Sequence, residues 1–428
     1  MTVVWMMVGA VTDTSAVFSV KVTGGPVRIG VSTSESFTSP SYSASTTVDA
    51  TKVAKVTFTG LSPATRYYWR VEDNGVVDAT YTGQLLTDPV AVGQPASYVL
   101  GCIGDAGLTP VVPGVTGSAV SRLSNHPIFD TVREKALAEN WARVCHLGDI
   151  CYYDLGSGSH GLSASATATQ YRTMWDDILA QPRQLGLYSS VPFVYIHDDH
   201  DFGPDNSNAS SPGTANALTV YRERVPHYTL PASAGNPVYH SFTVGRVLHI
   251  VSDTRSARVP GSTMLGAAQL AWLDTLLSTS TAEALVWLMP TPWLGISSDT
   301  WAGFTSERDT IVQMLIDGGW TDRMIMINAD AHTLAIDSGR GGNAGSGGFP
   351  VVLCAGLDAT PHSYSTQYDS GAWPGRGQYA TVSVHDGGGD ICLTATVYRG
   401  ERAISWVSVN TGGTTRVPAG NPCHVLAL

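Results

Sequence analysis

The first 90 residues alternate short apolar runs with clusters of Gly, Pro, Ser and Thr. Apolar runs occupy residues 16–22, 26–31 and 52–58, and the chain itself begins with a short apolar run. Runs of this length that are bounded by turn residues predict β-strands. We therefore expect residues 1–90 to form an all-β sandwich domain.

One tyrosine in this region is a candidate for a structural corner. The stretch GLSPATRYYWRV, residues 60–71, places Tyr67 between a Leu-x-Pro-x-Thr turn and an alternating strand. This arrangement resembles the E–F corner of a fibronectin type III sandwich, in which a tyrosine hydroxyl bonds back to the chain. The resemblance predicts a fibronectin III-like fold for this domain.

The pattern changes after a Pro- and Gly-rich linker at residues 87–97. Apolar runs of strand length now alternate with stretches of helical period, and further strands follow from about residue 349. Three helices are predicted, at residues 129–142, 170–186 and 264–277. The alternation predicts an α/β sandwich with at least partly parallel central strands, and we expect the late strands to complete a second sheet on the same core. We take residues 97–428 as one domain.

Composition narrows the classes of protein. Hydrophobic residues make up 43% of the 428 residues, charged residues 14%, and the net charge is -11. The chain therefore folds, and its acidic surface repels nucleic acid and anionic membranes. No apolar run reaches the roughly 20 residues of a membrane helix, so we expect no transmembrane segment and no nucleic-acid-binding domain. The six cysteines show no CxxC spacing, which argues against a zinc knuckle and leaves disulfides and buried thiols as alternatives.

Polar residues follow five of the predicted strands. In an open α/β sheet, ligands bind at the carboxyl ends of the strands, so we expect these side chains to lie close together. They are Cys102, Asp149, Tyr152, Asp198, Asp199, His200, Asp253, Arg255, Asp330 and His332. Each alone has a plain structural explanation, such as a helix cap, a packed ring or a buried thiol. The carboxylates of residues 198–201 around one histidine, however, would repel one another without a cation.

The donor types indicate which metals would bind. Thiolate, phenolate, carboxylate and imidazole together suit Fe³⁺ better than zinc or magnesium. Positions with oxygen donors only, such as Asp199 with Asn206 nearby, suit Ca²⁺ or another hard divalent ion. A mixed centre of this kind predicts hydrolysis by a metal-bound hydroxide. Because no lysine follows position 135, the positive charge that holds an anionic substrate must come from Arg, His or metal.

Four longer motifs carry a family resemblance. They are GDxxY at 148–152, DDHD at 198–201 followed by GPDN, DTRSxR at 253–258, and ADAHTLAIDSG at 329–339. Together they resemble the alkaline phosphatase D (PhoD-type) family of metallophosphatases. The resemblance implies a four-layer α/β (α+β) metallophosphatase sandwich behind an N-terminal β-sandwich, with Fe³⁺ and Ca²⁺ as cofactors.

The resemblance also implies roles for single residues. Asp149 would bridge two metals, His200 would assist the leaving group, and Arg255 would face the phosphate. The metal ligands that we predict are Cys102, Asp149, Tyr152, Asp199, Asn206, Asp330 and His332.

One ligand position has two candidates. The family usually has Gly-Ser-Cys at the first strand end, whereas this chain has Gly-Cys-Ile at 101–103. The GDAG that follows, at 104–107, resembles the first aspartate motif of purple acid phosphatases, so Asp105 competes with Cys102. We expect Cys102 to be the ligand, because it lies nearest the strand end.

These observations predict a hydrolase of phosphate mono- or diesters, of the alkaline phosphatase or phosphodiesterase type. One alternative is a phospholipase D-like phosphodiesterase. An alternative of another class is a surface-binding module on a degenerate metallophosphatase fold, against which the complete set of candidate ligands argues. We expect a monomer. The family implies a secreted or periplasmic location, but the apolar start lacks the basic region of a signal peptide, so a cytoplasmic location stays open.

Overall fold

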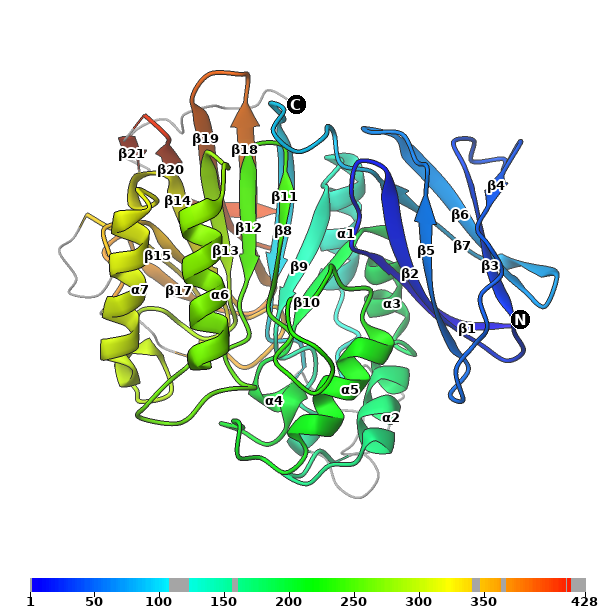
Figure 1. The fold of residues 1–428 in the computed structure, drawn as a ribbon, viewed down its shortest axis with the longest axis horizontal. Coiled ribbons are helices and arrows are strands. Elements are labelled where there is room, and N and C mark those ends of the chain that lie inside the picture. The colour runs from blue at the N-terminus through cyan, green and yellow to red at the C-terminus, as the bar shows by residue number, and fades with distance from the viewer. Residues whose placement is uncertain are drawn as a thin grey trace.

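The computed structural model describes residues 2–107, 123–155, 161–340, 347–362, 367–412 and 414–416. A small β-sandwich formed by the N-terminal strands lies beside a larger body of sheets and helices (Figure 1).

The N-terminal sandwich consists of two antiparallel sheets around their own core. One sheet contains β1 (Val3–Gly9), β2 (Ser15–Val22) and β5 (Val53–Thr59). The other contains β3 (Val27–Ser32), β4 (Ser41–Tyr42), β6 (Arg66–Asp73) and β7 (Val76–Leu86). Buried side chains from both sheets, among them Phe18, Ile29 and Trp69, form one cluster between them. The hydroxyl of Tyr67 accepts a hydrogen bond from the Ser62 N–H at 3.0 Å, as a corner tyrosine is expected to do.

The first sheet of the larger body has three parallel strands at its centre. These are β8 (Tyr98–Ile103), β9 (Arg143–Leu147) and β10 (Phe193–Ile196). Antiparallel strands extend the sheet beyond β8, namely β18 (Gln378–Asp386), β19 (Ile391–Arg399), β20 (Arg402–Asn410) and β21 (Thr414–Arg416). On the other side β1 pairs with β10 through Gly9 and Phe193, so the N-terminal strands continue the same ten-stranded sheet.

The second sheet has seven strands and is also mixed. Its strands are β11 (His240–Val244), β12 (Val247–Val251), β13 (Ala284–Leu288), β14 (Met324–Asn328), β15 (Thr333–Asp337), β16 (Val351–Cys354) and β17 (Ala372–Pro374). Among them β12, β13, β14 and β16 run parallel to one another.

Alternating residues of this sheet pack on opposite faces. In β12, Val247 and Val251 belong to the core that the sheet shares with the ten-stranded sheet, whereas Leu248 and Ile250 pack under helices. The period of two along a strand produces this division.

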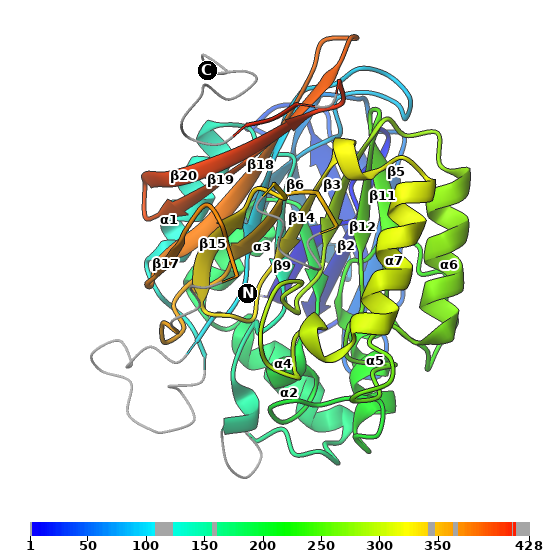
Figure 2. The same ribbon diagram turned by 90° about the vertical axis from the view of Figure 1, so that its left-hand side faces the viewer.

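Helices cover the outer faces and complete four layers. The seven-stranded sheet carries α6 (Gly266–Thr279) and α7 (Thr305–Asp317), which lie together on one side of the molecule (Figure 2). The ten-stranded sheet carries α1 (Ile128–Ala138), α2 (Ala168–Ile178) and α3 (Pro182–Ser190). Two further helices, the short α4 (Asp199–Phe202) and α5 (Thr214–Arg224), follow β10. The predicted four-layer sandwich is confirmed.

Two expectations about elements were wrong. The single helix predicted at 170–186 is two helices, because Pro182 begins α3 and its ring is compatible only with the first turn of a helix. The late strands do not form one sheet: β16 joins the seven-stranded sheet, whereas β18, β19 and β20 join the ten-stranded sheet.

The structure also shows the state of five cysteines and bears on membrane-spanning helices. Cys102, Cys145, Cys151 and Cys354 are free and buried, and Cys392 is disulfide-bonded. Among the described residues, no helix combines the length and apolar character that a membrane span requires.

Candidate metal centre

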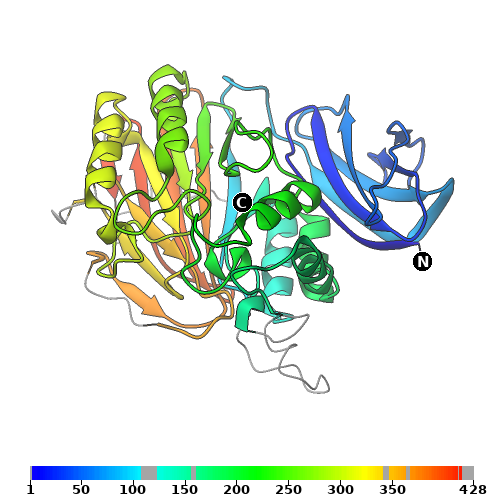
Figure 3. The same cartoon turned by 60° about the horizontal axis from the view of Figure 1, so that its bottom comes forward.

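Carboxylates meet where the parallel strands of both sheets end. Asp105 follows β8, Asp149 follows β9, Asp199 follows β10 and Asp330 follows β14, each within a few residues of the strand. Figure 3 brings this end of the strands forward, with the loops that follow them. The expectation that the strand ends share one site therefore holds for Asp149, Asp199 and Asp330, and Asp105 joins them at the end of β8.

The backbone at this edge is strained. Asp105, Asp149, Asp330 and His332 have φ values of 59°, 50°, 65° and 49°, in the left-handed region that residues with a β-carbon seldom adopt. Strain of this kind persists only where surrounding contacts enforce it, and it is concentrated at functional sites.

Glycines let the two strand ends approach. A β-carbon on Gly148, which has φ +82°, would lie 2.3 Å from the Cβ of Asp198. A β-carbon on Gly104 would lie 2.7 Å from the Cβ of Ala329, at the end of the other sheet. A residue larger than glycine at position 104 or 148 would therefore push the strand ends apart and displace the aspartate that follows it.

The first group of donors contains Asp105, Asp149 and His332, whose ligand atoms lie within 4.8 Å of one another. The hydroxyl of Tyr152 lies 2.5 Å from Nε2 of His332, at the same position. His332 Nδ1 lies 2.8 Å from the carbonyl oxygen of Thr360, to which it donates. Nε2 is thus left as an acceptor, which is the arrangement of a histidine that binds metal.

Asp149 provides the test of whether a cation fits. Both of its carboxylate oxygens are buried, and neither has a hydrogen-bond partner among the described residues. Burial, followed by the charges of Asp199 and Asp198, raises the pKa of Asp149 well above its usual range. An anion in this position is stable only beside a positive charge, so the donor set fits a metal ion.

Further donors surround Asp199. Its carboxylate forms one group with Asp149 and His200, and another with Asp198 and Asp330, each within 4.8 Å. The shared member Asp149 links the first group of donors to these. The arrangement offers adjoining positions for more than one cation.

His200 is bound by carboxylates on both ring nitrogens. Nδ1 lies 2.8 Å from Asp154, and Nε2 lies 3.7 Å from Asp205. Its ring packs against that of Tyr152, with centroids 4.5 Å apart. Burial lowers the pKa of His200, but the hydrogen bond to Asp154 and the charge of Asp199 outweigh it and raise this pKa to about 9.

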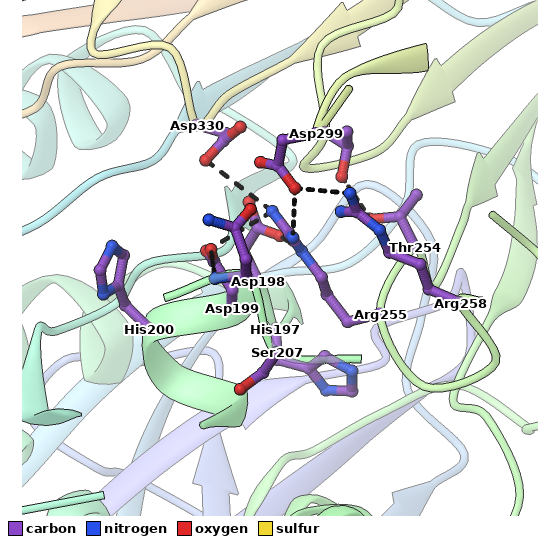
Figure 4. Close-up of polar contacts among 12 residues, drawn as sticks. His197, Asp198, Asp199, His200, Ser207, Thr254, Arg255, Arg258, Asp299 and Asp330 are labelled. Carbon is purple, nitrogen blue, oxygen red and sulfur yellow. Dashed lines mark hydrogen bonds and ion pairs between the residues drawn. The ribbon is translucent and has the colours of Figure 1, made fainter. Parts of the chain in front are cut away.

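Arg255 lies deeper than expected. Its side chain is fully buried and forms an ion pair with Asp198, and its Nη atoms lie 3.5 Å from Asp199, 3.3 Å from Asp299 and 3.9 Å from Asp330 (Figure 4). The guanidinium thus offsets part of the charge of the carboxylate cluster as well as facing it.

Three candidates from the sequence do not join the donors. Cys102 lies within β8, where its thiol contacts Cys145, its register partner on β9. The Asn206 side chain is exposed and donates to Asp205, while its backbone N–H donates to Asp199. Asp253 accepts hydrogen bonds from the backbone N–H groups of Val238, Arg255 and Ser256, and it stabilises the turn that follows β12.

Some supporting residues were not predicted from the sequence. Asp201 accepts from the Asp198 N–H at 2.7 Å, the Ile150 N–H at 3.1 Å and the Tyr195 hydroxyl at 2.6 Å, and it joins the loops after β9 and β10. Asp105, weighed only as a rival, accepts from the N–H groups of Asp330 and His332. The GDAG motif was the signal for Asp105, whereas Asp299 stands in no recognisable motif.

Comparisons with known proteins agree with this architecture. The chain is 25% identical over 273 residues to purple acid phosphatase 23 of Arabidopsis thaliana, covering 60% of this chain and 52% of that protein. It is 23% identical over 270 residues to alkaline phosphatase D of Bacillus subtilis, covering 52% of this chain and 46% of that protein. The chain thus spans about half the length of these curated relatives.

Solved structures match over more of the chain. The structure of PhoD superposes with a TM-score of 0.75 at 16% identity, covering 99% of this chain and 93% of that one. The purple acid phosphatase PPD1 of yellow lupin superposes with a TM-score of 0.63 at 13% identity, covering 95% and 73%. The fold is therefore that of the metallophosphatases. The family model of PhoD-like phosphatases matches residues 119–340, and the chain belongs to this family.

Proposed function

We propose that this protein is a metal-dependent phosphoric ester hydrolase that acts on phosphate mono- or diesters. The buried Asp149 carboxylate carries the proposal, because both of its oxygens lack a partner among the described residues and other acidic side chains surround it. Bound cations would offset this charge, polarise a phosphoryl oxygen and lower the pKa of a coordinated water.

The donors divide into two chemical types. Asp105, Tyr152 and His332 supply carboxylate, phenol and imidazole groups, which together suit Fe³⁺. Asp199 and its neighbours supply mainly carboxylate oxygens, which suit Ca²⁺. We assign Asp149 to both positions. Asp105 replaces Cys102 in this assignment because the thiol lies inside β8 against Cys145.

The residues of the chain would act on the substrate as follows. His200, held by Asp154 at 2.8 Å, would donate a proton to the departing alcohol. Arg255 would offset part of the charge of the cluster and present a guanidinium to the phosphoryl group.

Metal analysis together with a substrate screen tests the proposal. The purified protein should contain iron and calcium and should hydrolyse p-nitrophenyl phosphate, bis-p-nitrophenyl phosphate or both. Chelation should abolish activity, and the two metals should restore it. Metal-loaded protein that hydrolyses neither ester would contradict the proposed function.

A pair of variants tests the ligand assignment. Asp105→Asn should lose metal, because its carboxylate faces Asp149 and His332. Cys102→Ser should keep its metal, since the thiol lies inside the sheet against Cys145. The reverse pattern would place the thiolate in the centre.

A location outside the cytoplasm is also part of the proposal. The disulfide at Cys392 supports it, since disulfides persist in oxidising compartments. Mass spectrometry of alkylated protein from its natural cells would test this, and a fully reduced Cys392 would count against it.

The N-terminal domain assignment is a proposal as well. The separate core of residues 1–90 and the Tyr67 corner bond support a fibronectin III-like sandwich. Because β1 pairs with β10, one continuous sheet runs through both domains.

A further inference from the structure

A carboxylate at the rim of the metal centre bridges two arginines. Oδ1 of Asp299 lies 3.3 Å from Nη1 of Arg255 and 2.5 Å from Nη2 of Arg258. Figure 4 shows both guanidinium groups directed at this one carboxylate. Arg255 also reaches the metal-ligand candidates Asp199 and Asp330 through its Nη2. The guanidinium of Arg255 therefore connects the Asp299 carboxylate to the metal centre.

Arg258 has hydrogen-bonding capacity that Asp299 does not use. Its side chain is 4% exposed, and its Nε and Nη1 are buried without a hydrogen-bond partner among the described residues. Its guanidinium carbon lies 5.2 Å from the centre of the Phe304 ring, which fixes its position. Buried guanidinium donors that lack partners are costly, and planar pairs of them match the oxygens of a phosphoryl group.

Asp299 can leave this position more easily than either arginine. Its side chain is 28% exposed, and the preceding residues Ile296, Ser297 and Ser298 are exposed. Its carboxylate is thus held less firmly than the fully buried guanidinium of Arg255.

We propose that Arg258 binds a non-bridging phosphoryl oxygen of the substrate in the place of the Asp299 carboxylate, and that the charge of Asp299 sets the preference between phosphate diesters and monoesters. This rests on the proposed function. A monoester carries close to two negative charges above its second pKa of about 6, whereas a diester carries one. Asp299 competes with both for Arg258 but repels the monoester more strongly, and the site therefore favours the diester.

Substitution of Asp299 measures the effect of this charge. Asp299→Asn keeps the size and an acceptor oxygen and removes the charge. It should raise the ratio of kcat/KM for p-nitrophenyl phosphate to that for bis-p-nitrophenyl phosphate by roughly threefold to tenfold, the factor expected for one nearby charge in a partly exposed site. Arg258→Lys should raise KM for both esters more than it lowers kcat.

The matched control is Asp322→Asn. This substitution removes the same charge from a residue in η5 (Thr321–Arg323), which precedes β14 at the strand end opposite Asp330. The ratio should stay at the wild-type value. A ratio within twofold of wild type in Asp299→Asn, with metals and melting temperature intact, would overturn the proposal. Equal loss of both activities would show that Asp299 only positions the arginines and would overturn it too.

Phosphate binding separates this inference from the proposed function. Calorimetric titration of the metal-loaded protein with inorganic phosphate needs no turnover. Asp299→Asn should tighten phosphate binding by roughly threefold to tenfold and Arg258→Lys should weaken it. If neither ester is hydrolysed but these shifts appear, the anion site stands while the catalytic proposal fails. If esters are hydrolysed and phosphate affinity does not change in either variant, the anion site is wrong.

Discussion

At the scale of single residues, the centre contains polar side chains whose burial is unfavourable unless a cation is bound. Tyr152 and His332 illustrate this, since their polar atoms meet at 2.5 Å in a buried place between Asp105 and Asp149. Burial, followed by the charges of Asp149 and Asp105, raises the pKa of Tyr152 well above its usual value. Without a cation the phenol would stay protonated, so its ionisation reports metal binding.

The first prediction concerns the colour of the protein. If Tyr152 binds Fe³⁺ as a phenolate, the purified protein should show a visible charge-transfer band, and Tyr152→Phe should lose the band and most of the iron. Tyr153 provides the control, because its hydroxyl bonds to Asp177 outside the donor groups. Tyr153→Phe should keep the band. A colourless protein with stoichiometric zinc would exclude the iron assignment.

The second prediction concerns the proton on His200. A general acid contributes about 10²–10⁴-fold, so His200→Gln should lower kcat by roughly that factor while metal content is unchanged. Asp154→Asn removes the hydrogen bond that raises the pKa of His200, and this pKa should fall. Because an acid must be protonated to act, the alkaline limb of the kcat profile should move to lower pH in Asp154→Asn. An unshifted limb would mean that another group supplies the proton.

At the scale of elements, sequence patterns identified most strands and the edge where they end. β9, β12 and β14 are fully buried, mainly apolar strands followed by polar residues, and such runs are readable without a structure. Which strands pair with which was harder to predict, because the strands after residue 349 look alike in sequence but belong to two different sheets. Helix α5 was missed because TANALTVYRER is mostly polar, whereas α6, which is no more amphipathic, stands out by its many apolar residues.

The site was predictable to the degree that its ligands follow strands. Asp149, Asp199, Asp330 and His332 stand in motifs next to apolar runs, and the structure brings them together. Asp299 lies on a loop without such a signal, and its contact with Arg258 arises from tertiary folding alone. The choice between Cys102 and Asp105 depended on where β8 ends, which is a matter of one or two residues and is poorly defined by sequence.

The third prediction concerns the junction of two strand ends. A methyl group at Gly148 would lie 2.3 Å from the Cβ of Asp198, and Gly148 has φ +82°. Gly148→Ala should lower the free energy of unfolding by about 2–4 kcal/mol and reduce metal content, because the loops that carry Asp149 and Asp199 must separate. Gly235 is the matched control, with φ +80° and no atom within 4 Å of the place that a β-carbon would occupy.

Gly235→Ala should cost only about 1 kcal/mol, the strain of a left-handed alanine, and should leave metal content unchanged. Differential scanning calorimetry and metal analysis of both variants measure the contrast. Equal losses in the two would show that backbone strain, and not the approach of the strands, explains the glycine.

At the scale of the whole molecule, the metal centre ties the two sheets together. Asp105, which follows β8 of the ten-stranded sheet, accepts hydrogen bonds from the backbone N–H groups of Asp330 and His332, which connect β14 to β15 of the seven-stranded sheet. The N-terminal sandwich adds to the same body, since Trp5 and Met7 from β1 belong to the core shared by both sheets. Loss of the cations should therefore affect global stability as well as catalysis.

The fourth prediction follows from the charge left in the metal-free protein. Burial raises the pKa of Asp105 and of Asp198 to about 7, and it raises the pKa of Asp149 and Asp330 well above their usual range. An unfolded aspartate titrates near pH 4, so between about pH 4 and 7 these carboxyl groups bind more protons in the folded protein than in the unfolded chain. Buried histidines such as His146 and His240, whose pKa burial lowers, act in the opposite sense. The contribution of these carboxyl groups to the free energy of unfolding must then fall as the pH rises through this window. In chelated protein, the gain in melting temperature from pH 8 to pH 5 should therefore be larger in the wild type than in Asp149→Asn, which lacks one of these carboxyl groups.

Metal binding should reverse the effect of pH on this centre. Cations balance the carboxylates, and they bind most tightly where their ligands are deprotonated, so the metals should stabilise the protein most at pH 8. Calorimetry at one scan rate compares chelated and metal-loaded protein at both pH values. An equal change in melting temperature between pH 5 and pH 8 in chelated wild type and chelated Asp149→Asn would show that the buried carboxylates of the centre do not limit the stability of the metal-free protein.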